Sequence, residues 1–187
     1  MLTDRFDAAL SYASELHREQ TRKGTAIPYV SHLLSVAALV LEDGGSEDEA
    51  IGALLHDAAE DQGGAATLAV IRERFGPSVA NIVHDCTDAW EEPKPAWRVR
   101  KEAYIVSLDH KPLASVRVSL ADKTHNARAI LSDYRVLGDE LWSRFTGGRE
   151  GTLWYYRSLS AAFDRLVPGR LADALRLAVN ELTALTT

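Results

Sequence analysis

Apolar residues recur every three or four positions along most of the chain, the spacing at which side chains share one face of an α-helix. The first such stretch follows Thr3, a residue type that caps helices, and places Phe6, Leu10 and Ala13 on one face. Glycine, proline and polar clusters separate the stretches. The predicted helices cover residues 3–20, 29–42, 47–61, 66–75, 77–87, 97–109, 113–131, 138–145, 149–166 and 169–185.

The polar–apolar alternation of a β-strand is not sustained anywhere in the sequence, so the pattern predicts an all-α fold. With 187 residues, of which 46% are hydrophobic, the chain is long enough for one core and short for two. We expect a single helical bundle spanning residues 1–187. The clearest loop is residues 88–96, and the segment from Trp90 to Trp97 is either a mobile lid or a rigid connector.

Four polar side chains interrupt the alanine-rich apolar stretch at residues 50–61: His56, Asp57, Glu60 and Asp61. Such groups are costly to bury, which suggests a chemical role. In a continuous helix His56 would lie one turn from Glu60, and Asp57 one turn from Asp61. A divalent cation would let these neighbouring carboxylates stay ionised at neutral pH.

Two distant segments offer further ligands for a cation. His32 stands alone near the start of an apolar helix, and Asp122 follows a hydrophobic run, with Asn126 one turn later. Together with His56 and Asp57 they would form a site of two imidazoles and two carboxylates, a donor set that suits Mn, Fe or Zn better than Ca. Taken singly, each has a structural alternative: a buried core histidine, a surface His–Asp pair, or a salt bridge from Asp122 to an arginine.

These residues belong to an ordered set of motifs. The set comprises Arg22-Lys23, residues 28–32, residues 56–61, Phe75-Gly76 and residues 120–128. It resembles the HD-domain metal-dependent phosphohydrolases and, more narrowly, the hydrolase domain of the RelA/SpoT family and its small stand-alone alarmone hydrolases. The matching core runs from about residue 17 to residue 130, and residues 138–187 would supply packing helices.

The resemblance implies hydrolysis of the 3′-pyrophosphate of guanosine tetra- or pentaphosphate to pyrophosphate and GDP or GTP. It assigns a Mn²⁺ ion, or another divalent transition metal, to His32, His56, Asp57 and Asp122. It makes Glu60 and Asp61 the catalytic acidic pair. It also gives substrate contacts to Arg22 over the guanine, Lys23 at a phosphate, and Asn126.

The sequence departs from the family pattern at three places: Leu33 replaces a common proline, Gln62 a threonine, and Ala129 a polar residue. None of these changes removes a proposed ligand, but Ala129 belongs to the substrate pocket. Two alternatives therefore remain open. One is another HD phosphohydrolase, such as a 5′-nucleotidase or a nucleotide pyrophosphatase, and the other is a non-catalytic nucleotide-sensing module.

Composition narrows the expected partners and location. A net charge of −6 argues against extended nucleic acid as a partner, although Arg18, Arg22, Lys23, Lys123 and Arg128 could form a local basic patch for a small polyanion. There is no apolar run of membrane-spanning length and no signal-peptide pattern at the N-terminus. One cysteine, Cys86, suits a reducing compartment, so we expect a cytoplasmic protein. The sequence predicts no oligomeric state.

Two further expectations concern residues near the motifs. His125 lies one turn from Asp122 and is expected to be structural, or to brace that carboxylate. Trp154, Tyr155, Tyr156 and Phe163 form an aromatic core stripe, from which a tyrosine hydroxyl could reach the pocket.

Overall fold

The computed structural model of the protein describes residues 1–88, 90 and 93–186. Within them the elements are α1 (Asp4–Leu16), α2 (Val30–Glu42), α3 (Glu47–Leu55), α4 (Ala58–Asp61), α5 (Gly64–Phe75), α6 (Pro77–Cys86), α7 (Trp97–Ser107), η1 (Leu108–His110), α8 (Leu113–Leu137), η2 (Gly138–Arg144), α9 (Gly148–Leu166) and α10 (Arg170–Leu185). The all-α prediction is confirmed: no described residue lies in a strand, and one isolated bridge joins Thr21 to Pro28.

Most predicted helices agree with the structure to within a few residues, but those predicted over residues 3–20, 47–61, 113–131 and 138–145 do not. The first helix ends at Leu16 rather than near residue 20, and α8 continues to Leu137 instead of stopping near residue 131. The segment Gly138–Arg144 is a 3₁₀-helix. The described residues of the 88–96 segment form the predicted loop, and Ala89, Glu91 and Glu92 of that loop lie outside the described residues.

The helix predicted over residues 47–61 is wrong as one continuous helix. It ends at Leu55 and restarts at Ala58, and the turn between the two pieces holds His56 and Asp57. The reason lies in the His56 side chain, whose Nδ1 is 2.8 Å from the carbonyl oxygen of Ala53. In an unbroken helix that oxygen would accept from the backbone N–H of Asp57. The ring therefore competes with the backbone, and the break turns both side chains toward one space.

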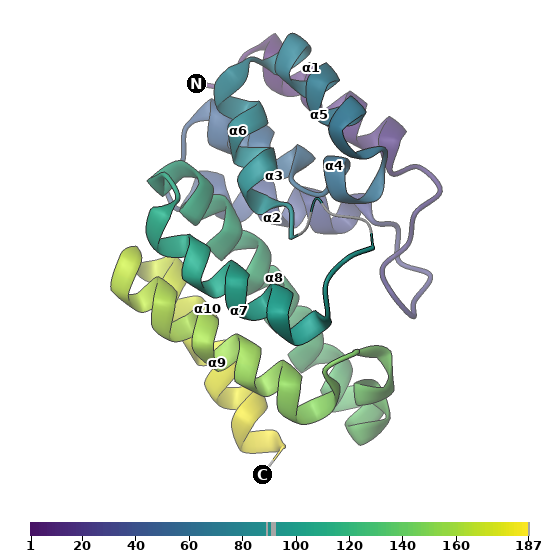
Figure 1. Ribbon diagram of the computed structural model, residues 1–187, viewed down its shortest axis with the longest axis vertical. Coiled ribbons are helices and arrows are strands. Elements are labelled where there is room, and N and C mark those ends of the chain that lie inside the picture. Colours follow the sequence, from purple (N-terminus) through teal and green to yellow (C-terminus); the bar gives the residue numbers. More distant parts are fainter. Residues whose placement is uncertain (89, 91–92, 187) are drawn as a thin grey trace.

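The helices form two groups that share α8 (Figure 1). Helices α2, α3 and α6 pack against α8, the longest helix among the described residues, and α9 and α10, from the C-terminal part of the chain, also pack against it. Apolar side chains such as Leu33, Leu54 and Leu120 are almost completely buried in the core. Because α8 contacts both groups, its side chains can face a site that lies between them.

The start of α3 is fixed by a capping box that also ties this helix to α8. Ser46 and Glu49 exchange side-chain and backbone hydrogen bonds at the helix N-terminus. The Glu49 carboxylate, which is buried, also pairs with Arg117 of α8, and Arg117 pairs in turn with Asp43. These contacts hold α3 in register with α8, and therefore His56 in register with Asp122.

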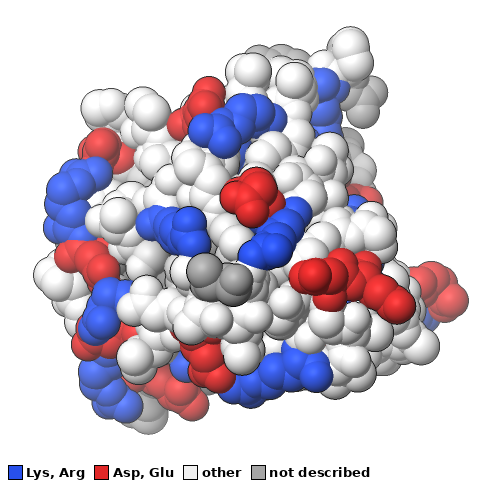
Figure 2. All heavy atoms as spheres, turned by 90° about the horizontal axis from the view of Figure 1, so that it is seen from below, with Lys and Arg blue, Asp and Glu red and all other residues white. Residues whose placement is uncertain are grey.

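Charged side chains of both signs are interspersed on the face shown in Figure 2, rather than gathered by sign. On that face the described residues form no broad basic surface of the kind that binds a nucleic-acid backbone. Among the described residues, no helix is both long enough and apolar enough to cross a membrane.

Candidate functional site

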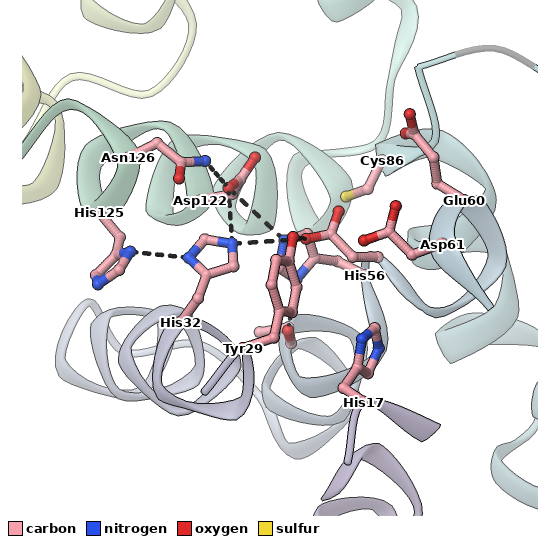
Figure 3. A network of polar contacts seen from close by, with 12 residues as sticks. His17, Tyr29, His32, His56, Glu60, Asp61, Cys86, Asp122, His125 and Asn126 are labelled. Carbon is pink, nitrogen blue, oxygen red and sulfur yellow. Dashed lines mark hydrogen bonds and ion pairs between the residues drawn. The ribbon is translucent and has the colours of Figure 1, made fainter. Parts of the chain in front are cut away.

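The fold brings together all four residues that the sequence suggested as metal ligands, and Figure 3 labels three of them, His32, His56 and Asp122. One ligand atom each from His32, His56 and Asp57 lies within 4.8 Å of the other two. The fourth residue, Asp122, approaches from α8, where its Oδ1 is 3.2 Å from Nε2 of His32 and 3.7 Å from Nε2 of His56. A carboxylate oxygen of Asp57 lies 3.0 Å from Nε2 of His56 and 3.6 Å from that of His32.

Both imidazoles present an unpartnered nitrogen to the centre of this cluster. The Nε2 atoms of His32 and His56 are buried, and neither has a hydrogen-bond partner among the described residues. At the other side of each ring, Nδ1 is occupied. His56 Nδ1 donates to the Ala53 carbonyl, because a carbonyl can only accept, and this leaves its Nε2 free to act as a ligand in the neutral ring.

The second imidazole is held by another histidine. Nδ1 of His32 is 2.8 Å from Nδ1 of His125. Burial, together with the neighbouring His32 ring and the charge of Arg22, lowers the pKa of His125 to about 4, so its ring is neutral near pH 7. A neutral His125 can accept through Nδ1 while His32 donates, which again frees Nε2 of His32. The sequence placed His125 near Asp122, and the structure pairs it with His32 instead.

Electrostatics also favours a cation between these groups. Burial alone would raise the pKa values of Asp57 and Asp122, but the histidines and Lys123 outweigh it and hold both well below the usual range. Burial would lower the pKa of His56, yet the same two carboxylates raise it well above its ordinary value. One buried and one half-buried carboxylate, together with two imidazole nitrogens that have no hydrogen-bond partner among the described residues, fit a divalent transition metal.

Other side chains orient the carboxylates. The Tyr29 hydroxyl donates to Oδ2 of Asp57 over 2.6 Å, and Lys123 Nζ lies 2.6 Å from Oδ2 of Asp122. Asn126 donates its amide to the other oxygen of Asp122. These roles of Tyr29 and Lys123 were not predicted from the sequence, although Tyr29 precedes His32 within the same motif and Lys123 follows Asp122 directly.

The acidic pair on α4 is divided between two environments. Asp61 is turned toward the histidine cluster, whereas Glu60 points away from it (Figure 3). Glu60 accepts from the backbone N–H of Asp88 and from Lys94, at 3.1 and 2.9 Å. Burial and the nearby charge of Asp57 raise the pKa of Asp61, which makes its carboxylate a stronger base than an exposed aspartate. Gln20 donates to Asp61 over 2.8 Å and fixes its position.

A pocket of about 630 Å³ adjoins the cluster and contains all three predicted substrate-binding residues, Arg22, Lys23 and Asn126. Its walls come from the turn after α1, from α8, and from α7 and α9. Arg22 donates to Oδ1 of Asn126 over 2.5 Å, and its guanidinium lies 5.6 Å from the ring centre of Tyr29. Arg22, Asn126 and Asp122 therefore form one hydrogen-bonded line from the pocket to the metal cluster.

The pocket also contains basic side chains that do not lie beside the sequence motifs. Lys123 from the predicted patch is present, and Lys101 and Arg144, which are distant in sequence, join it. From the aromatic stripe, Tyr155 lines the pocket too, with a buried hydroxyl that has no hydrogen-bond partner among the described residues. Only the tertiary fold brings α7, η2 and α9 to this wall, so sequence spacing gave no signal for them.

The comparisons with known proteins agree with this geometry. A family model described as an HD domain matches residues 9–153, and the chain belongs to the HD-domain family. Over 141 residues it is 36% identical to the guanosine-3′,5′-bis(diphosphate) 3′-pyrophosphohydrolase MESH1 of Xenopus tropicalis, covering 72% of each protein. It is 42% identical over 122 residues to the enzyme of the same catalytic name from Aquifex aeolicus, covering 65% of this chain but only 17% of that protein.

Solved structures match the fold as well. A metazoan ortholog of SpoT, described as hydrolysing ppGpp, superposes with a TM-score of 0.74 over 98% of this chain and 96% of its own. The identity to that ortholog is 24%, so this likeness concerns the fold alone. A protein of Listeria monocytogenes EGD-e gives a TM-score of 0.69 at 27% identity, covering 81% of this chain and 99% of the other.

Proposed function

We propose that the protein is a guanosine 3′,5′-bis(diphosphate) 3′-pyrophosphohydrolase that uses a divalent metal ion, with Mn²⁺ as the expected ion. One observation carries the proposal: two buried imidazole nitrogens without partners among the described residues face two carboxylates, and Lys123 and Asn126, which contact one of these carboxylates, line the adjoining basic pocket. The relatives that carry this catalytic name, one of them 36% identical over 141 residues, support the choice of substrate.

In this proposal His32, His56, Asp57 and Asp122 hold the ion. Bound there, the ion would acidify water and neutralise charge on the phosphoryl oxygens. Tyr29, Lys123 and Asn126 orient the two carboxylates, and the capping contacts between α3 and α8 keep their helices in register.

The protein's own residues carry the proton transfers. Water attacks the phosphorus atom that is bonded to the 3′ oxygen, and the bond from this phosphorus to the 3′ oxygen breaks, which yields pyrophosphate and a nucleoside 5′-diphosphate with a free 3′ hydroxyl. Asp61 accepts the proton of the attacking water, because its raised pKa makes it the stronger base of the pair. The proton then passes to the departing 3′ oxygen, and Glu60, held by Lys94 and by the Asp88 N–H, completes the acidic pair.

Substrate recognition follows from the pocket. Arg22 presents a planar cation on which guanine can stack, and Lys23, Lys101 and Lys123 compensate the phosphate charges. The chain acts as one domain on a small nucleotide in the cytoplasm, a compartment that suits the unpaired Cys86.

The test is product analysis. Purified protein loaded with Mn²⁺ is incubated with guanosine tetraphosphate and with a panel of nucleoside mono-, di- and triphosphates, and the products are separated by chromatography. We expect GDP and pyrophosphate from the tetraphosphate, and no products after chelation of the metal. Cleavage of another panel member in place of the tetraphosphate would refute the substrate. Tight metal binding without any turnover would favour a nucleotide sensor.

The contact between His125 and His32 leads to a prediction about metal affinity. His125→Leu removes the acceptor for Nδ1–H of His32, so the ring loses its fixed orientation and tautomer. We expect Mn²⁺ to bind about 10- to 100-fold more weakly. His125→Asn keeps an acceptor oxygen near the same position and should retain most of the affinity. Competition against a metal-binding dye measures both variants, and equal affinity of the leucine variant and the wild type would contradict the role.

A further inference from the structure

The outer end of the pocket carries an ion pair that the proposed chemistry does not use. Nη1 of Arg144, at the end of η2, is 3.1 Å from Oδ2 of Asp133 on α8, and both residues line the pocket. Arg144 also lies against the turn after Arg22. A Cβ atom at Gly24, whose φ is +72°, would come within 2.9 Å of Arg144 Nε. The pair is thus fixed on two sides, by α8 and by the turn.

The position of this pair along α8 separates it from the metal cluster. Lys123 follows the ligand Asp122, whereas Asp133 lies ten residues further along the same helix, or about 15 Å at the helical rise. Between them, Asn126, Ala129, Ile130 and Ser132 line the pocket. A nucleotide with its scissile phosphate at the cluster would extend along this wall toward Asp133.

Charge decides which part of a nucleotide can lie at the outer end. The pocket is lined by five lysine and arginine residues, and Asp133 is the one carboxylate among its described lining residues. A carboxylate repels phosphate and accepts hydrogen bonds, so an uncharged part of the substrate that offers donors suits the place beside Asp133 better than a phosphate does. Among nucleobases, guanine presents two adjacent donors, N1–H and the N2 amine, which match the two oxygens of a carboxylate.

We propose that Asp133 is a specificity-determining residue that selects guanine, by accepting hydrogen bonds from N1–H and N2–H while Arg144 keeps its carboxylate in place. This inference rests on the proposed function, since it places the base of that substrate at the outer end of the same pocket. The apolar side chains of Ala129 and Ile130 would then lie against the base.

Asp133→Asn tests the proposal, because an amide keeps one acceptor and replaces the other by a donor. Calorimetry with the metal-loaded protein would measure the affinity for GDP, for inosine diphosphate, which lacks the N2 amine, and for xanthosine diphosphate, which has a carbonyl at C2. We expect the wild type to prefer GDP. In the variant, GDP should bind about 10- to 100-fold more weakly and xanthosine diphosphate more tightly, so the preference reverses.

Asp109→Asn is the matched control, since Asp109 is an equally exposed carboxylate paired with an arginine, Arg165. It should leave all three affinities unchanged. If Asp133→Asn weakens all three ligands equally, or changes none, or if the wild type does not discriminate between them, base selection by Asp133 is refuted. Hydrolysis of guanosine tetraphosphate by the wild type is scored separately. If the wild type hydrolyses guanosine tetraphosphate but Asp133→Asn leaves the base preference unchanged, only this inference is refuted. If Asp133→Asn changes the base preference but the wild type does not hydrolyse guanosine tetraphosphate, only the proposed function is refuted.

Discussion

The double variant Glu60→Gln, Asp61→Asn should lose about three orders of magnitude in kcat while it still binds metal and nucleotide. Both replacements keep the size and most acceptor contacts of the carboxylates. The new amide oxygen at position 60 can still accept from Lys94, and the one at position 61 can still accept from Gln20. What disappears is the basic group that takes a proton from water. Single-turnover kinetics with guanosine tetraphosphate, together with metal and GDP titrations, separate lost chemistry from lost binding.

The adjacent exposed acids Asp139 and Glu140 provide the control. Asp139→Asn with Glu140→Gln removes the same two charges on η2, so it should keep wild-type kcat. A Glu60, Asp61 double variant that stays fully active would show that neither carboxylate takes part in proton transfer. A variant that loses metal would show instead that the pair acts as ligands.

Removal of a metal ligand should abolish the stabilisation that the ion provides. For the wild type, Mn²⁺ at 100 times its dissociation constant should add about 2.7 kcal/mol to the free energy of unfolding. In a chain of this length that free energy raises Tm by about 5–10 °C. His56→Ala removes one bare nitrogen from the cluster, so its Tm should hardly change when Mn²⁺ is added. Thermal unfolding with and without the ion measures the difference.

Each variant serves as its own reference, because the measured quantity is the shift caused by Mn²⁺ and not the absolute Tm. His84→Ala, which removes a largely exposed imidazole outside the cluster, should keep the full shift. Asp122→Asn repeats the test from α8 if the alanine variant does not fold. A full Mn²⁺ shift in both ligand variants would mean that the ion binds elsewhere.

Local sequence patterns predicted the helices well because most are bounded by a glycine, a proline or a capping residue. Ser46 with Glu49 marks the start of α3, and Gly76 with Pro77 separates α5 from α6. The break at His56 could not be predicted in the same way. It depends on the ring nitrogen of His56 occupying the Ala53 carbonyl, and no breaking residue stands at that position.

The candidate site likewise has features that the local sequence contains and features that depend on the tertiary fold. His32, His56, Asp57 and Asp122 were suggested by polar residues within apolar helices, a feature that sequence alone contains. The different surroundings of Glu60 and Asp61 were not foreseen, since they depend on Lys94 and Gln20, each more than 30 residues away in the chain. The partner of His125 also follows from how α2 packs against α8, not from residue spacing.

Because α8 carries Asp122 and Asp133 on one uninterrupted helix, the distance between them is a property of helix geometry and cannot adjust to the ligand. One residue inserted between them would advance the outer end by about 1.5 Å and turn it by about 100°, away from the pocket. Insertions and deletions should therefore be excluded from this part of α8 in any chain that keeps the site.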